Sequence, residues 1–243
     1  MGVGLVGQDG IPRLEAAPSG PNRTNMHATR GRVIEPEWLD DDSGPDKRAS
    51  LHDLVRIGRY LGGHRVLRGL MKRVTGPHDA FSLLDVGSAT GDAVAIIRGV
   101  RPGASVTSFD YRLEHVAAAP RPSVVGDAFH LPFRKDAFDF VYCSLFLHHF
   151  DNDAIVRLLR DFRRVARRAV LLIDLERGPG AYYFMPLSQW LFHWNRITLH
   201  DAPASVEAAF KKDELAALAR AAGFESIDVR RHRPWARLSL VGQ

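Results

Sequence analysis

The sequence of 243 residues predicts an α/β protein with a mostly parallel sheet and helices on both of its faces. Two observations predict this fold. Short apolar runs alternate with segments of helical period along most of the chain, which is the pattern of strand–helix–strand units. Glycines and acidic residues follow several of these runs, where turns from strand to helix are expected. The length favours one domain, because two ordinary domains and a linker would need more residues.

Composition excludes several classes of protein. With 45% hydrophobic and 25% charged residues the chain resembles a soluble globular protein, and no apolar run approaches the ~20 residues of a membrane span. The net charge of +5 comes mainly from arginines scattered through every segment, which disfavours a nucleic-acid groove. The single cysteine, Cys143, is expected in a buried strand and favours a reducing compartment. We therefore expect a cytoplasmic protein without nucleic-acid partners or integral membrane contact.

The N-terminal part divides into a tail and a helical segment. Residues 1–29 carry Gly, Pro, Ser and Asn without hydrophobic period, which predicts a disordered tail, and translation could start at Met26 instead of Met1. After a polar stretch, apolar residues recur at helical spacing from about 50 to 74. One or two amphipathic helices are predicted there, so that residues 30–75 form a helical cover.

The remaining chain alternates between strands and helices. A first short helix is expected over Ala93 to Val100, and the clearest helix runs from Asp153 to Ala166 with Asp151 or Asn152 as its cap. A last helix from Lys212 to Ala222 ends at Gly223. The stretch from 176 to 209 is rich in aromatic residues and fits neither period well. Apolar runs that predict strands lie at 82–87, 105–109, 123–126, 138–143, 169–174, 225–231 and 236–241.

Polar residues and glycines mark the ends of four successive strands. The first strand ends in an acid and a turn that contains Gly87 and Gly91. Asp110 follows the second strand, Asp127 the third, and the sequence Leu-His-His-Phe at 147–150 the fourth. In open α/β sheets, ligands bind beyond the carboxyl ends of the strands, so these residues are predicted to gather around one ligand.

These motifs together resemble the class I S-adenosylmethionine-dependent methyltransferases over residues 81–243. Asp-Val-Gly-x-x-x-Gly at 85–91, Gly-Asp-Ala-x-x-Leu-Pro-Phe at 126–133 and Leu-His-His-Phe at 147–150 are similar to small-molecule enzymes of the quinone-biosynthesis type. The run at 50–63 and His-Asp-x-x-x-Ser at 200–205 are similar to methyltransferases that accompany polyketide-forming enzymes. One departure is Ala89, where the family usually has a glycine.

The resemblance implies a Rossmann-like sheet of seven strands, mostly parallel, with an antiparallel last strand. It further implies a cofactor-binding domain over 76–243 and a substrate lid inserted at about 176–210. The cofactor would be S-adenosylmethionine, with the loop from Gly87 to Gly91 beside its amino-acid end, Asp110 on the ribose and Asp127 on the adenine. The implied cofactor-binding residues are Asp85, Gly87, Ser88, Ala89, Gly91, Asp110, Tyr111, Asp127, Ala128, Ser144 and Leu145.

Three histidines are candidates for a general base. Methyl transfer from a sulfonium is an in-line displacement, and a base is needed only where the acceptor must lose a proton. Adjacent side chains on an irregular turn are expected to point apart, so we expect only one of His148 and His149 to face the site, and we favour His149. His200 is its rival or partner, and a packing or capping role is the alternative for each histidine. The eleven histidines show no metal-ligand spacing, so no metal site is expected.

The sequence thus predicts a methyltransferase for an oxygen or carbon of a small aromatic, quinone-like or polyketide-derived acceptor, acting as a monomer or homodimer. A nicotinamide-dependent oxidoreductase is the first alternative, although Ala89 replaces the second glycine of its motif and Asp92 would repel a pyrophosphate. A protein that binds S-adenosylmethionine without turnover is the second alternative.

Overall fold

The computed structural model describes residues 31–35, 45–89 and 91–243. The expected tail over residues 1–29 lies outside these ranges. All elements discussed below belong to one compact unit that begins at Gly31.

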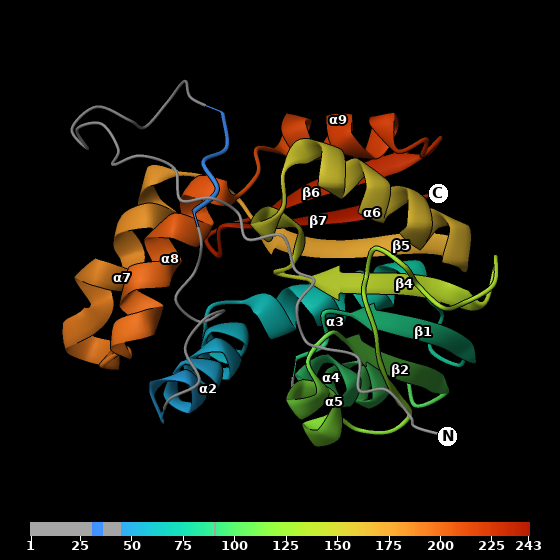
Figure 1. Ribbon diagram of the computed structural model, residues 1–243, viewed down its shortest axis with the longest axis horizontal. Coiled ribbons are helices and arrows are strands. Elements are labelled where there is room, and N and C mark those ends of the chain that lie inside the picture. Colours follow the sequence, from blue (N-terminus) through green and yellow to red (C-terminus); the bar gives the residue numbers. More distant parts are fainter. Residues whose placement is uncertain (1–30, 36–44, 90) are drawn as a thin grey trace, which may run out of the picture. The chain divides into compact units, whose positions relative to one another are not determined.

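Seven strands form a single sheet in the order β3-β2-β1-β4-β5-β7-β6 (Figure 1). Only β7 runs antiparallel to its neighbours β5 and β6, and the pairs among the other strands are parallel. The predicted Rossmann-like sheet with an antiparallel last strand is therefore confirmed. The strands are β1 (Phe81–Val86), β2 (Ala104–Asp110), β3 (Ser123–Val125), β4 (Phe138–Ser144), β5 (Ala166–Leu175), β6 (Ile227–His232) and β7 (Arg237–Gly242).

Helices pack on both faces of the sheet because successive strand residues point to opposite sides. Leu83 of β1 joins an apolar cluster with α3 (Gly63–Val74) and α4 (Asp92–Val100). Leu84 joins the opposite cluster, which contains residues of α6 (Asn152–Val165) and α9 (Lys212–Ala221). The short α5 (Leu113–Ala118) contacts β2 and β3 at the end of the sheet. This arrangement fixes the carboxyl ends of the parallel strands along one edge.

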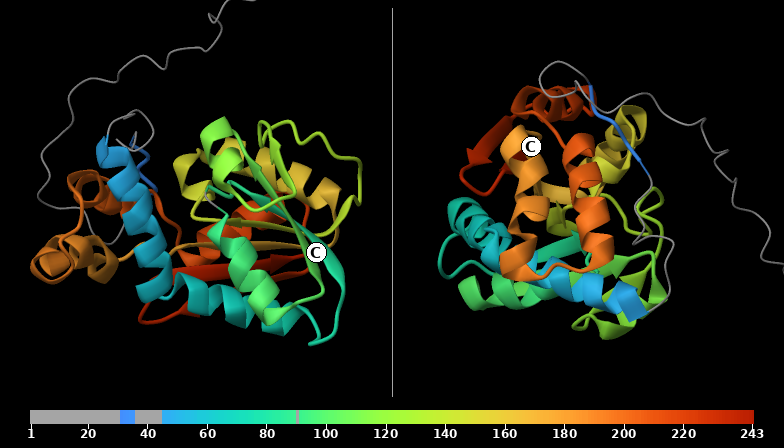
Figure 2. Two further views of the ribbon diagram at one scale, coloured as in Figure 1. Left: turned by 90° about the horizontal axis from the view of Figure 1, so that it is seen from below. Right: turned by 90° about the vertical axis from the view of Figure 1, so that its left-hand side faces the viewer.

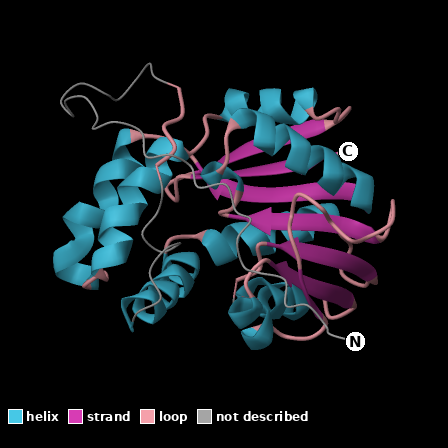
Figure 3. Cartoon of the chain, viewed as in Figure 1, coloured by secondary structure: helices cyan, strands magenta, loops and turns pink. Residues whose placement is uncertain are grey.

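Further helices lie beyond that edge. The arrowheads of β4 and β5 point toward α7 (Pro179–Phe192) and α8 (Arg196–Ala208), which lie side by side (Figures 1 and 2). Helix α2 (Pro45–Tyr60) joins them, since the backbone N–H of Asn195 donates to Asp53 Oδ2 at 2.8 Å. A single 3-10 turn, η1 (Leu147–His149), follows β4. Figure 3 shows α2, α7 and α8 as a group of helices beyond the ends of the strands. Within the described ranges, no helix has the length and apolar character that a membrane span requires.

The predicted elements agree with the structure except in the region after β5. The predicted strands all appear, and Asp151 caps α6 by accepting from the Ala154 N–H at 2.7 Å. Residues 176–209 match neither the helical nor the strand periodicity well in the sequence, yet they contain both α7 and α8. Each of these helices has an internal proline, Pro186 and Pro203, which ordinarily argues against a helix. Packing between the two helices outweighs that local preference.

The core on the α6 side of the sheet generates a stability prediction. Leu158 of α6 is 0% exposed, whereas Leu113 of α5 is 70% exposed. We expect Leu158→Ala to lower the free energy of unfolding by roughly 2–5 kcal/mol, because a cavity replaces buried methyl groups. The same substitution at Leu113 should change it by less than about 0.5 kcal/mol. Urea unfolding of both variants checks this, and equal effects would contradict the described packing.

Candidate functional site

The turn between β1 and α4 is held in a tight conformation. Gly87 and Gly91 have φ of 68° and 72°, and a Cβ at Gly87 would lie 2.7 Å from Cδ2 of Phe146. The N–H groups of Gly87 and Ser88 both donate to Phe109 O, at 2.9 and 3.2 Å. Ala89 has φ of 45°, a conformation in which glycine is less strained, so the family's usual glycine there has a physical reason.

Asp110 connects this turn to the end of β2. Its Oδ2 accepts from the Ala89 N–H at 2.9 Å, and its Oδ1 accepts from the Arg112 N–H at 2.9 Å and lies 3.2 Å from His115 Nδ1. Burial opposes the charge of this carboxylate, but these hydrogen bonds outweigh it and lower its pKa. An ionised carboxylate thus stands at the end of β2, as the sequence predicts.

Asp127, after β3, is more exposed to solvent than Asp110. It accepts from the Phe129 N–H at 2.9 Å and lies 2.8 Å from Nδ1 of His130. These contacts outweigh a partial burial and lower the pKa of Asp127 as well. Tyr111, one of the implied cofactor-binding residues, is 71% exposed.

A cavity of about 590 Å³ opens at the carboxyl edge of the sheet. Residues from α2 and α3, from α7 and α8, and from the start of β7 line it together with the strand ends. Its walls are mostly apolar, which suits a small organic ligand. The predicted site residues that line it are Asp85, Gly87, Ser88, Ala89, Ser144, Leu145, His148 and His149.

The other predicted residues do not border this cavity. Asp110, Tyr111, Asp127 and Ala128 lie around the ends of β2 and β3, one and two strands away from β1. Gly91 lies at the start of α4 and His200 on α8. The proposed nucleoside contacts therefore remain predictions from the sequence.

Asp85 at the end of β1 is a buried acid without compensation. Its side chain borders the cavity, and Oδ2 has no hydrogen-bond partner. Burial, with added repulsion from Asp92 and Asp110, raises its pKa well above the ordinary value. A buried acid of this kind fits the ammonium group at the amino-acid end of S-adenosylmethionine, because that positive charge would compensate the carboxylate.

His148 forms a buried pair with Asp174, the penultimate residue of β5. Nδ1 of His148 lies 2.6 Å from Oδ1 of Asp174, and both side chains are less than 5% exposed. The N–H groups of Leu147 and Leu175 also donate to Asp174, at 3.1 and 2.8 Å. Burial opposes the charge of Asp174, but His148 and the Leu175 N–H outweigh it and lower its pKa. Sequence reasoning missed Asp174, because it lies 26 residues from its partner.

The His148 and His149 rings do not point apart, contrary to our expectation. Their centroids are 4.3 Å apart with 32° between the ring planes, and both residues line the cavity. The 3-10 turn η1 has three residues per turn, which brings consecutive side chains to the same side more readily than an extended chain would. Both histidines can therefore contact a ligand bound in the cavity.

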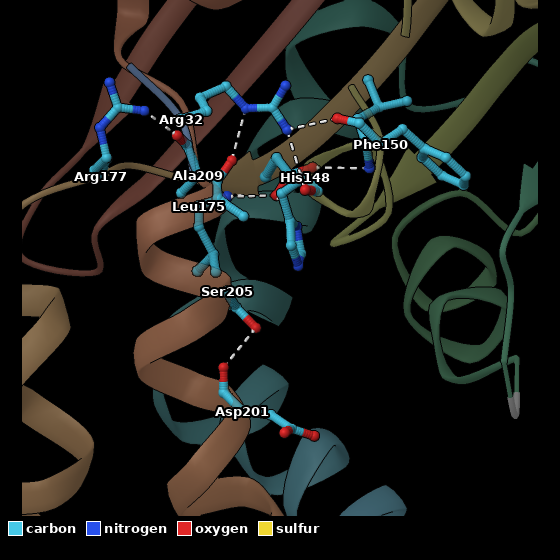
Figure 4. A network of polar contacts seen from close by, with 11 residues as sticks. Arg32, His148, Phe150, Leu175, Arg177, Asp201, Ser205 and Ala209 are labelled. Atoms are coloured by element: carbon cyan, nitrogen blue, oxygen red, sulfur yellow. Dashed lines mark hydrogen bonds and ion pairs between the residues drawn. The ribbon is translucent and has the colours of Figure 1, made fainter. Parts of the chain in front are cut away.

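Arg32 fixes the backbone of this histidine turn from a distant part of the chain (Figure 4). Its Nη2 donates to the carbonyls of His148 and Phe150 at 3.0 and 2.9 Å, and its Nε donates to Ala208 O at 2.7 Å. The guanidinium also lies 4.3 Å from the centroid of the Phe210 ring. The segment 31–35, expected only as polar surface, thus ties the turn to the end of α8.

His200 lies beside the cavity, while its neighbour Asp201 lines it. Nδ1 of His200 is 2.9 Å from Oδ1 of Asp201, and the His200 side chain is 38% exposed. Asp201 is buried, and its carbonyl accepts from Ser205 Oγ at 3.1 Å (Figure 4). The predicted His-Asp-x-x-x-Ser motif therefore contributes its acid and serine, rather than its histidine, to the cavity wall.

Comparisons with known proteins agree with this geometry. A family model described as "Methyltransferase domain" matches residues 84–173. The ubiquinone/menaquinone biosynthesis C-methyltransferase UbiE of Paracoccus denitrificans is 32% identical over 59% of this chain and 60% of its own length. A demethylmenaquinone methyltransferase of Thermotoga maritima is 28% identical over 45% of this chain and 52% of its own length. The chain thus spans little more than half of these two relatives.

A solved structure shows the same fold. The S-adenosylmethionine-dependent methyltransferase SibL superposes with a TM-score of 0.60 at 16% identity, covering 84% of this chain and 60% of SibL. Residues 84–173 therefore match a methyltransferase domain, and the chain is similar to methyltransferases of quinone biosynthesis. The sheet order and the superposition on SibL show that the fold is shared.

Proposed function

We propose that this chain transfers a methyl group from S-adenosylmethionine to an oxygen or a carbon of a small, flat, mainly apolar acceptor such as a phenol or quinol. One observation carries this proposal. A single cavity of about 590 Å³ is bordered both by the turn after β1 and by His148, which is paired with the buried Asp174. The names of the relatives, which act in quinone biosynthesis, support an aromatic acceptor.

Two carboxyl groups are proposed to hold the cofactor from opposite ends. Asp85 offers an uncompensated acid at the cavity wall, and Asp110 offers an ionised carboxylate at the end of β2. The bound cofactor supplies a methyl group on a positively charged sulfur. The protein then accelerates the reaction mainly by orienting the acceptor, because the acceptor atom must lie in line with the methyl carbon and the sulfur.

We propose His148, in place of His149, as the base for acceptors that must lose a proton. The ionised Asp174 accepts a hydrogen bond at Nδ1 of His148, which leaves Nε2 as the basic nitrogen. That nitrogen can accept the proton of an acceptor hydroxyl, and Asp174 stabilises the resulting imidazolium. His149 shares the cavity wall, and its ring centroid lies 4.3 Å from that of His148.

A nicotinamide-dependent oxidoreductase is less well supported. Asp92 opens α4 beside the turn, where a pyrophosphate would need uncharged N–H groups, and Ala89 stands at the second glycine position. Incubation with isotopically labelled methyl donor and a panel of phenols and quinols, read by mass spectrometry, tests the proposed activity. Tighter binding of NADH than of S-adenosylhomocysteine in calorimetry would refute it.

The role of Asp110 leads to a binding prediction. Asp110→Ala should weaken S-adenosylhomocysteine binding by on the order of tenfold or more, because a charge-assisted hydrogen bond is lost and the Ala89 N–H is released. Calorimetric titration measures this. Asp228→Ala is the matched control, since that carboxylate is half-exposed on β6, and it should bind as the wild type does. Unchanged affinity in Asp110→Ala would make this acid merely structural.

The raised pKa of Asp85 leads to a prediction about pH. The folded protein keeps a proton on Asp85 at pH values where the unfolded chain, with its ordinary pKa of 3.8, has released it. The stability that Asp85 contributes is therefore complete at low pH and declines as the pH rises above that value. Asp85→Asn cannot ionise, so the unliganded variant should melt at a higher temperature than wild type, by a margin that grows from about pH 4 upward.

The same variant should bind S-adenosylhomocysteine more weakly, because its amide cannot become an anion opposite a positive charge. Thermal melts across the pH range, with and without this ligand, check both expectations. A variant that is no more stable than wild type at neutral pH would show that Asp85 is compensated.

The proposed base leads to a kinetic prediction. With an acceptor that must lose a proton, His148→Asn should lower turnover by on the order of 10²–10⁴-fold while the affinity for S-adenosylhomocysteine stays within about twofold. Asp174→Asn should also lower turnover, because the imidazole loses its orienting carboxylate. His149→Asn is the matched comparison, because it changes the neighbouring histidine of the same cavity wall and leaves the His148–Asp174 contact in place. If His149→Asn is the slower enzyme, the sequence-based preference for His149 is right.

A further inference from the structure

The first residue of β7 lies at the functional edge of the sheet. Because β7 is antiparallel, its beginning lies beside the end of β5, and Arg237 pairs with Leu175 in the register. Arg237 is among the residues that line the cavity, together with His148. Sequence reasoning did not identify it, since a strand that starts with arginine has no distinctive pattern.

The charge of Arg237 is buried and incompletely paired. The residue is 2% exposed, and its Nε and Nη1 have no hydrogen-bond partner. The nearby carboxylate, Asp174, is already bonded to His148 and to two backbone N–H groups. Burial lowers the pKa of Arg237, yet a guanidinium keeps its charge in proteins. A cation is therefore held at the cavity wall with two donors unused.

Another buried arginine shows what a purely structural role looks like. Arg101 is 7% exposed, and its guanidinium donates to Thr75 Oγ1, Thr75 O and Val100 O at 2.8, 2.8 and 3.0 Å. Such hydrogen bonds compensate for the free energy lost when the charge is removed from water. Arg237 lacks them, which indicates that its partner belongs to a ligand rather than to the fold.

We propose that Arg237 binds an anionic oxygen of the acceptor, so that the acceptor class is a mainly apolar aromatic molecule that carries a carboxylate or an ionised enol or phenol. This inference rests on the proposed function, because it assigns the acceptor to the same cavity. The unused N–H groups of a guanidinium suit such an oxygen, and the apolar walls suit the remainder of the molecule.

The methionine carboxylate of the donor has the same chemistry and is the other possible source. Sheet order favours the acceptor. Arg237 is on β7, with β5 and β4 between it and β1, and it lies beside the strand that carries Asp174. The turn from Gly87 to Gly91, where the donor's amino-acid end is expected, follows β1. The experiment therefore separates the two sources.

The test compares two probes of equal shape, 2-naphthoate and 2-naphthamide, by calorimetry with and without saturating S-adenosylhomocysteine. Wild type should bind the carboxylate on the order of ten- to a hundredfold more tightly than the amide. Arg237→Met should reduce this ratio to near one and leave the affinity for the amide unchanged. Arg231→Met is the matched control, because Arg231 is a β6 cation paired with Glu176 at 2.7 Å, and it should keep the wild-type ratio.

A stability readout distinguishes a ligand partner from a structural one. Without ligand, Arg237→Met should melt at the same temperature as wild type or higher, because it removes an unpaired buried charge. Arg237→Lys is the second variant, and its ratio should lie between those of wild type and one, since the cation remains but the two-pronged geometry is lost.

Several results would overturn the inference. They are equal binding of the two probes by wild type, a preference for the carboxylate that survives in Arg237→Met, or a large loss of melting temperature in that variant. If Arg237→Met weakens S-adenosylhomocysteine but not 5′-methylthioadenosine, which lacks the amino-acid end, Arg237 belongs to the donor. Failure of wild type to bind S-adenosylhomocysteine refutes the proposed function instead, and the probe ratio without that ligand still tests Arg237.

Discussion

The ionised carboxylate of Asp174 is the constraint on which the edge of the sheet depends. It is buried at the end of β5, and it accepts from the N–H groups of Leu147 and Leu175 while it lies 2.6 Å from Nδ1 of His148. An ionised carboxylate at this depth is stable only if most of its acceptor sites are used. The same contacts fix the conformation of η1 and hence the positions of both histidines. The placement of the two histidines and the compensation of the Asp174 charge thus depend on the same contacts.

The fold was largely predictable because the sheet is buried on both faces. Strands such as β1 and β5 are continuous apolar runs, and α6 has a clear period and the cap Asp151. The helices α7 and α8 were not predictable. Pro186 and Pro203 lie inside them, and apolar residues of both helices line the cavity. Only tertiary packing stabilises them, and no local pattern reports it.

Candidate site residues that depend on a tight turn or a strand end were predictable from the sequence. Those that depend on contacts with distant strands were not. Gly87, Gly91 and the strand-end acids Asp85 and Asp110 stand in a recognisable order, because a tight turn and a strand end leave a local pattern. Asp174 on β5 lies against His148 of the cavity wall, Arg237 on β7 lines the cavity, and nothing near them in the chain marks them. Their positions arise from sheet order, which periodicity does not encode.

Asp85 and Asp174 are buried to the same degree, yet they differ in charge for a physical reason. Asp174 has an imidazole and two N–H donors, whereas Asp85 has an orphan oxygen and the repulsion of Asp92 and Asp110. Asp85 therefore has a buried oxygen without a partner, and Arg237 on the same cavity has two donors, Nε and Nη1, without one. Neither arrangement stabilises the empty protein. Both arrangements are reasonable if a cationic donor and an anionic acceptor enter together, because each ligand then supplies the partner that one of these groups lacks. The cavity would select the orientation of the ligands through the same two buried groups that reduce the stability of the empty fold.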